Sequence, residues 1–99
     1  MDMQRLMQQA QQMQRKLAKI EAELDAKEYE GSNNGVVVRI TGKNEVIAVE
    51  IPEELMNPDD REELQDMILL AANSALSVAS QEREEKMGAI TQGVRMPGM

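Results

Sequence analysis

The chain has 99 residues, only one of them aromatic, and it contains neither Cys nor His. That length allows one domain with a thin margin of stability, and the missing residue types exclude disulfides, thiol chemistry and ordinary zinc sites. The formal net charge of −7, taken as a whole, opposes contact with nucleic acid or anionic membranes, and the longest apolar run, MILLAA at 67–72, is too short to cross a bilayer.

The charges are spread unevenly along the chain. Residues 1–16 carry a net charge of +2, residues 17–79 carry −9 and residues 80–88 carry −1. The acid is therefore concentrated in the middle, and the two ends are close to neutral or slightly basic.

The first predicted element is a helix over residues 2–26, because its residues are good helix formers and include no Gly or Pro. Its apolar residues alternate at spacings of three and four, a pattern typical of a helix that packs along another helix. We call this set the heptad seam: Met3, Leu6, Ala10, Met13, Leu17, Ile20 and Leu24. A long seam in a chain with so light a core favours a homodimer.

A sheet is predicted next. The sequence EYEGSNNG is rich in turn-forming Gly and Asn, with a short edge strand possible over 27–30. A hairpin follows, in which Val36, Val38 and Ile40 share one face and residues 41–44 make the turn. On the return strand, over 46–51, either Ile47 continues the alternation or a bulge turns Val46 inward. The expected result is a three-stranded antiparallel sheet.

A second helix is predicted over residues 58–87. Asn57 is suited to cap it, Pro58 to begin it and Gly88 to close it. Around 67–72 the helix is apolar on nearly every side, so we expect this turn to be buried from several directions. Residues 1–93 then form a single domain, and residues 94–99 a mobile tail.

These elements predict an α+β subunit of order α-β-β-β-α. The residues predicted for the core or a dimer interface are Val38, Ile40, Val49, Ile51, Leu64, Met67, Ile68, Ala71 and Ala75. Helices of about 37 and 45 Å must overhang strands of about 17–20 Å. If the helices are antiparallel, the N-terminal half of the first and the C-terminal end of the second, where apolar residues become fewer, lie side by side. They then form a two-helix arm held by Met3, Leu6, Ala10 and Met13.

Three segments, LMQQAQQMQ, YEGSNNGVVVRITGKNEVIAVEI and EEKMGAITQG, together resemble the YbaB/EbfC family of bacterial nucleoid-associated proteins. The resemblance runs from Leu6 to Gly93. It implies a tight two-fold homodimer with protruding helical arms, binding to double-stranded DNA with little sequence preference, and a location in the cytoplasm and nucleoid. Several arm positions that are often Lys in such proteins are Gln here, among them Gln8 and Gln12.

The resemblance assigns the candidate DNA contacts to the arm cations, namely Arg5, Arg15, Lys16, Lys19, Arg83 and Lys86. Because no aromatic residues are interleaved with them, contact with the duplex backbone is favoured over stacking on single strands. Acidic pairs such as Asp59-Asp60 do not converge on one site, since neighbouring helix positions point about 100° apart. We therefore expect no enzymatic activity, cofactor, metal, membrane or small-molecule substrate.

A second hypothesis of another class stays open: a protein-interaction module whose helical arms hold a partner protein. The net charge of −7 and the Gln residues of the arm favour it. Partners that remain after nuclease treatment would distinguish it from DNA binding.

Overall fold

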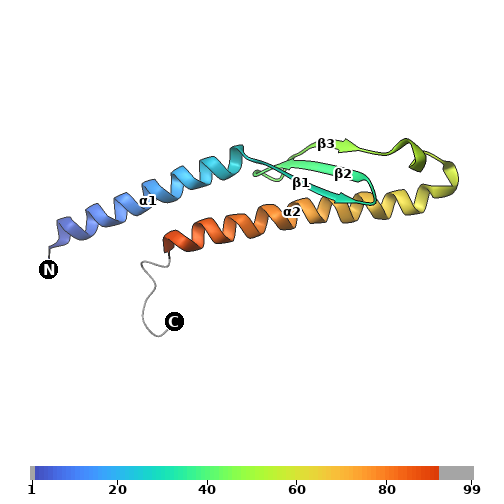
Figure 1. Cartoon of the computed structure of the whole chain (residues 1–99). Coiled ribbons are helices and arrows are strands. Elements are labelled where there is room, and N and C mark those ends of the chain that lie inside the picture. The colour runs from blue at the N-terminus through green and yellow to red at the C-terminus, as the bar shows by residue number, and fades with distance from the viewer. Residues whose placement is uncertain (1, 92–99) are drawn as a thin grey trace, which may run out of the picture.

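The structure is a computed structural model that describes residues 2–91. In chain order it has α1 (Met3–Ala26), β1 (Glu28–Asn33), β2 (Val36–Thr41), β3 (Val46–Glu50), two short 3-10 turns (Glu53–Leu55 and Pro58–Asp60) and α2 (Arg61–Thr91). The molecule is elongated, with extents of 71 × 28 × 13 Å, and α1 lies beyond the sheet (Figure 1). The predicted α-β-β-β-α order is confirmed. The proposed tail, residues 94–99, lies outside the described residues.

Helix α1 begins where its sequence provides a cap. Asp2 has an extended backbone, and its Oδ1 accepts hydrogen bonds from the amides of Gln4 and Arg5, at 3.1 and 3.4 Å. These bonds satisfy amides that the helix itself leaves without partners. The chain then becomes extended at Lys27, one residue before β1.

The sheet is antiparallel, with the order β1-β2-β3. Asn34 and Gly35 both have positive φ, as a two-residue hairpin turn requires, and β1 is longer than predicted because all six of its residues pair with β2. Between β2 and β3, Arg39 pairs with Ala48 and Ile40 with Val46, so the strand carries a bulge. Of the two predicted alternatives, the bulge is the correct one.

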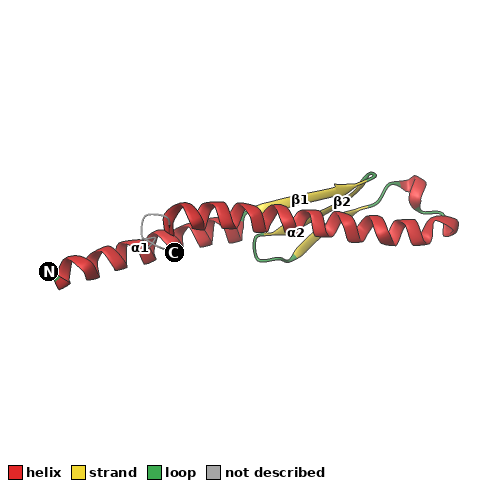
Figure 2. Ribbon diagram, turned by 90° about the horizontal axis from the view of Figure 1, so that it is seen from below, coloured by secondary structure: helices red, strands yellow, loops and turns green. Residues whose placement is uncertain are grey.

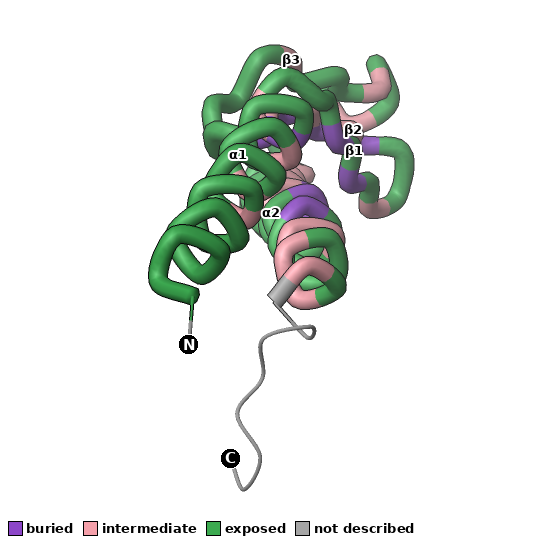
Figure 3. Tube along the Cα trace, turned by 90° about the vertical axis from the view of Figure 1, so that its left-hand side faces the viewer, coloured by how far each residue is buried: buried purple, intermediate pink, exposed green. Residues whose placement is uncertain are grey.

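The core lies between α2 and the first two strands (Figure 2). A Cβ built at Gly31 would lie 2.2 Å from the Ala71 carbonyl oxygen, so the backbones of β1 and α2 are nearly in contact. Of the predicted residues, Val38, Ile40, Ala71 and Ala75 are buried; Leu64, Met67 and Ile68 are half-buried and pack against them. Figure 3 shows the buried positions concentrated on these elements, and outside them Leu24, near the end of α1, is also buried.

Two expectations about burial fail within the single chain. Val49 and Ile51 remain 46% and 36% exposed, because α2 covers β1 and β2 and leaves β3 uncovered. Leu69 and Leu70, in the turn expected to be buried from several directions, are each more than half exposed. The chain alone therefore leaves apolar surface on β3 and on α2.

Helix α2 differs from the prediction at both ends. Pro58 begins a 3-10 turn capped by Asn57, and the α-helix proper starts at Arg61. Gly88 does not close the helix, which continues to Thr91. One Gly costs a helix only about 1 kcal/mol relative to Ala, and the residues beyond it border α1, as described below.

Candidate nucleic-acid interface

The two helices form an arm that projects from the sheet. Helix α1 and the C-terminal half of α2 run antiparallel, side by side (Figures 1 and 3). Shallow grooves lie between them, and Lys16 and Ile90 border both. The prediction of a projecting arm built from these two segments is confirmed.

The heptad seam is covered along only part of its length. Leu24 is buried, and Met13, Leu17 and Ile20 are half-buried. Met3 and Leu6 are exposed because the last described residues of α2 reach only as far as Gln9, and Ala10 is exposed as well. Within the described residues, the expectation that α2 covers the outer half of the seam is therefore wrong for Met3, Leu6 and Ala10, whereas Met13 does lie against α2.

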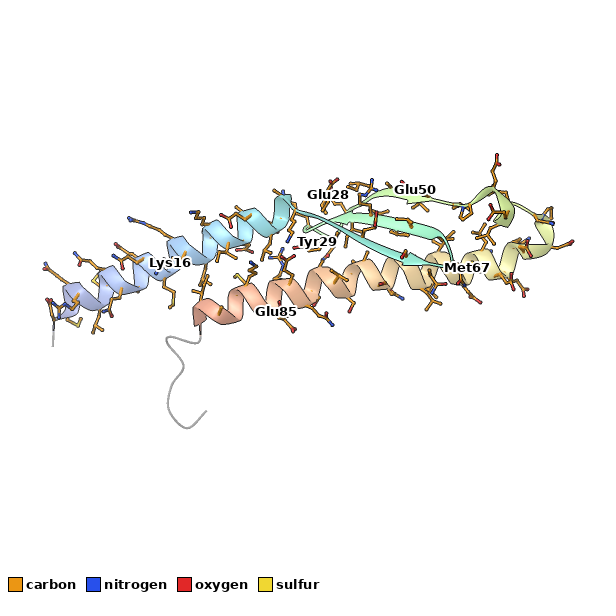
Figure 4. All side chains as sticks on the ribbon, in the orientation of Figure 1. Lys16, Glu28, Tyr29, Glu50, Met67 and Glu85 are labelled. Atoms are coloured by element: carbon orange, nitrogen blue, oxygen red, sulfur yellow. The ribbon has the colours of Figure 1, made fainter. Side chains whose placement is uncertain are left out.

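Four predicted DNA-contact residues share one side of α1. At about 100° per residue, Arg5, Arg15, Lys16 and Lys19 fall within a sector of about 100° that is centred away from the heptad seam, although Lys16 and Lys19 also border the grooves against α2. All four are exposed, and none forms an ion pair among the described residues. With Asp2 as the only acid between residues 2 and 20, this stretch carries a net charge of +3. We call these four residues the α1 cations; Figure 4 labels Lys16 among them.

The two predicted contacts on α2 lie in a different environment. Lys86 is exposed, but it follows Glu82, Glu84 and Glu85, and its charge contributes to lowering the pKa of Glu82. Arg83 is only 33% exposed at its side chain. Its guanidinium donates to Oδ1 of Asp25 at 2.7 Å and to the carbonyl of Gly42 at 3.0 Å. Arg83 therefore ties together three elements of the chain.

The bonds of Arg83 belong to a polar cluster at the base of the arm. We call it the arm joint: Asp25, Lys27, Tyr29, Gly42, Glu82 and Arg83. The amide of Gly42 donates to the Lys27 carbonyl at 2.9 Å. A Cβ at Gly42 would lie 1.8 Å from the Leu24 carbonyl oxygen, so only Gly allows the β2–β3 turn to approach the end of α1 this closely.

Tyr29 and Glu82 lie at the centre of the arm joint. Lys27 pairs with the Glu82 carboxylate, and its ammonium lies 5.6 Å from the centre of the Tyr29 ring. The pKa of Tyr29 is raised to about 12, chiefly because the side chain is buried and secondly because it interacts with the Glu82 carboxylate. The bond from Lys27, followed by the influence of Tyr29, holds the pKa of Glu82 below its usual range. The joint thus fixes the direction in which α1 leaves the sheet.

The arm joint was missed by sequence reasoning, which gave Arg83 a role in DNA contact. Its partners Asp25 and Gly42 are 58 and 41 residues away in the sequence. No local pattern reports such pairs. From the sequence, Gly42 could be interpreted only as a turn-forming residue. In the structure its close approach to Leu24, which leaves no space for a Cβ, is the stronger reason for Gly at this position.

Two cations of the sheet region, Arg39 and Lys27, are less available than those of α1. Arg39 lies between Glu30 and Glu50 on the outer face, at 3.2 and 3.7 Å, and Lys27 belongs to the arm joint. Figure 4 shows Glu50 and Glu28 on the strands. The sheet region therefore presents mostly acid, with Lys43 in the β2–β3 turn as an exposed exception, and four exposed cations lie together on α1.

Within residues 2–91, no group of three or more Asp and Glu side chains is placed to hold a metal ion. In the same part of the chain, no helix is long and apolar enough to cross a membrane.

The comparison with known families decides the relationship. The model of the YbaB/EbfC DNA-binding family matches residues 1–94. The chain belongs to that family. YbaB/EbfC relatives named as nucleoid-associated proteins include one from Clostridium novyi (strain NT), 43% identical over all of this chain and 89% of its own length. Another, from Chloroflexus aurantiacus, is 42% identical over 96% of this chain and 97% of its own length.

A solved structure supports the YbaB/EbfC fold. The crystal structure of an uncharacterized protein from Helicobacter pylori superposes with a TM-score of 0.76 at 18% identity. The match covers 91% of this chain and 97% of that one. At this identity the likeness concerns the fold, in which two long helices accompany a three-stranded sheet.

Proposed function

We propose that this YbaB/EbfC protein is a non-enzymatic, nucleoid-associated DNA-binding protein that contacts the phosphate backbone of duplex DNA through the α1 cations. The observation that carries the proposal is the position of Arg5, Arg15, Lys16 and Lys19, which are exposed and unpaired on a projecting helix in a member of a DNA-binding family. Its curated relatives are named nucleoid-associated proteins.

Backbone contact explains why little sequence preference is expected. Lys, Arg and Gln side chains donate to phosphate oxygens, which are the same at every base pair. The chain has a single aromatic residue, Tyr29, and it is buried, so no ring is free to stack on an unpaired base. Double-stranded DNA is therefore the favoured partner.

A homodimer completes the proposal. Apart from the outer end of α1, the uncovered apolar residues of the described chain form two groups, on β3 with the segment after it and on α2: Val46, Ile47, Val49, Ile51 and Met56, then Leu69, Leu70, Leu76 and Val78. Soluble chains seldom leave so much apolar surface uncovered without a partner for it. A second copy that covers both groups would give each dimer two arms and eight α1 cations.

The dimer is tested by its mass. The wild type should have twice the chain mass of 11.1 kDa, and Val49→Glu should lower the mass towards that of one chain. Ala48→Glu is the matched control, because the side chains of neighbouring strand residues point to opposite faces. If Val49→Glu stays dimeric, β3 is not in the interface.

The DNA interface is tested by salt titration on random-sequence duplexes. If about half of the eight α1 cations reach phosphates, the logarithm of affinity should fall with that of salt concentration with a slope near −4. The variant Arg15→Glu with Lys16→Glu should bind far more weakly, with a shallower slope. The control variant Lys43→Glu with Arg61→Glu makes the same change in net charge at exposed positions near the sheet. Equal losses in both variants would refute the interface.

The alternative, a protein-interaction module, draws support from the same uncovered apolar surface on β3 and α2. A pull-down from nuclease-treated extract separates the two functions. Partners lost with the nucleic acid support DNA binding, whereas a protein retained at stoichiometric amounts supports the module.

A further inference from the structure

The outer end of α1 carries an apolar edge that nothing in the described structure covers. Residues 3–10, which we call the arm tip, continue the heptad seam outward, and the last described residues of α2 reach only its inner end, at Gln9. Met3, Leu6 and Met7 are 71%, 49% and 60% exposed. The seam that packs against α2 nearer the sheet therefore continues outward without a partner helix.

The charge of the arm tip is unlike that of the rest of the chain. Between residues 2 and 14 the only charged side chains are Asp2 and Arg5, which cancel, while the whole chain carries −7. The positions around Leu6 are mainly Gln, which is uncharged and both donates and accepts hydrogen bonds. Two copies can therefore approach tip to tip without the repulsion that their acidic sheet regions would produce.

We propose that the arm tip pairs with the arm tip of a second dimer, seam against seam, and that this pairing makes dimers bind cooperatively to DNA. The inference rests on the proposed function. Eight residues make only about two helical turns, roughly 12 Å, which is too little contact to hold free dimers together. On DNA, neighbouring dimers meet at a high local concentration, and a weak contact then becomes effective.

Cross-linking tests the contact directly. The natural chain has no Cys, so Leu6→Cys introduces a single thiol. Leu6 lies near the middle of residues 3–10, so two copies of it meet whether the tips pair parallel or antiparallel. The control is Gln8→Cys, which lies on the opposite side of α1. On long DNA, oxidative cross-linking of Leu6→Cys should rise with the density of bound protein and exceed that of Gln8→Cys about tenfold.

Three results would overturn the proposal. The first is equal or absent cross-linking at the two positions. The second is a yield that does not depend on protein density, which would place the contact inside one dimer. The third is a Leu6→Cys thiol that a small reagent cannot reach in the free protein, which would mean that the segment after α2 covers the tip.

A binding experiment separates this inference from the proposed function. Met3→Gln with Leu6→Gln should bind as well as wild type when protein is sparse on the DNA. On long DNA it should lose the sigmoidal binding curve, and its half-saturating concentration should rise about tenfold. The control, Gln4→Ala with Gln8→Ala, should remain cooperative. Non-cooperative wild-type binding of normal affinity would refute tip pairing alone, whereas a wild type that binds no DNA would refute the proposed function and this inference with it.

Discussion

Arg83 offers the sharpest test of how the arm is held. Its guanidinium joins α2 to Asp25 at the end of α1 and to the Gly42 carbonyl in the β2–β3 turn. The side chains of Arg83 and Asp25 are 33% and 30% exposed, so the pair lies between the surface and buried cases. A hydrogen bond to a charged group contributes about 1.5–3 kcal/mol, and solvent screening at this exposure reduces the estimate to about 1–2 kcal/mol.

The assay is thermal unfolding with a double-mutant cycle. Arg83→Ala should lower the melting temperature by about 5–15 °C, as expected for about 1–2 kcal/mol in a domain of this size. Adding Asp25→Ala should cost much less once Arg83 is absent, because the two share one interaction. Lys86→Ala, three residues further along α2, is the matched control and should change stability little. A coupling energy near zero, or an equal loss in the control, would refute the clamp.

The same position decides between a structural role and a phosphate contact. Arg83→Lys keeps the charge, but an ammonium cannot reproduce the fork that reaches both Asp25 and Gly42. If Arg83 holds the arm, Lys restores neither stability nor DNA affinity at a temperature where the variants are folded. If it contacts phosphate, as the sequence interpretation had it, Lys restores most of the affinity, and Arg83→Ala lowers affinity without lowering stability.

Three further predictions concern the joint and the core. Tyr29 is the only aromatic residue, so tyrosinate absorbance should titrate near pH 12 in the folded protein and near pH 10 in denaturant. The free energy of unfolding, measured with denaturant, should therefore fall as the pH rises between these values. Titration at the same pH in the folded and the denatured protein would contradict this. Because the pKa of Glu82 is lowered in the folded protein, its ionised carboxylate stabilises the fold at pH values above the ordinary carboxyl range, and this stabilisation is lost as the pH falls through that range. Glu82→Gln should therefore make the free energy of unfolding depend less on pH in the acid range. An unchanged pH dependence would contradict the pairing with Lys27. Gly31→Ala should lower the free energy of unfolding by about 3 kcal/mol or more, because the added Cβ would meet the α2 backbone. Gly88→Ala, which has open space around its Cβ, should raise the free energy of unfolding by about 0.5–1 kcal/mol. Similar effects at both positions in denaturant unfolding would contradict the packing of β1 against α2.

The elements of the fold were predictable because each has a local cause. The heptad seam, the Asn34-Gly35 turn and the alternation of Val36, Val38 and Ile40 each act over a few residues. The predictions about Gly88 and Val49 failed because each depends on residues far away in the sequence. Whether Gly88 ends a helix depends on what lies beyond it, and whether Val49 is buried depends on how far α2 extends across the sheet.

The residues of the candidate site also differ in whether their roles depend on nearby or on distant parts of the sequence. The α1 cations could be found from sequence because exposure and unpaired charge follow from a polar helix with few acids. The role of Arg83 could not, because its partners come from segments that only the folded chain brings together. The resemblance to a family implied DNA as the ligand but treated all arm cations alike.

The net charge of −7 is compatible with DNA binding because salt limits the reach of the acidic groups. At physiological ionic strength the screening length is about 8 Å. Along α1, the first acid after Arg15 is Glu21, six residues or about 9 Å away, so Arg15 is about one screening length from it. Lys19 is followed within one turn by both Glu21 and Glu23, about 3 and 6 Å along the helix axis, and its charge is partly cancelled. The contribution to DNA affinity should therefore increase outward along the arm, and what governs binding is the distance between the α1 cations and the acidic sheet region.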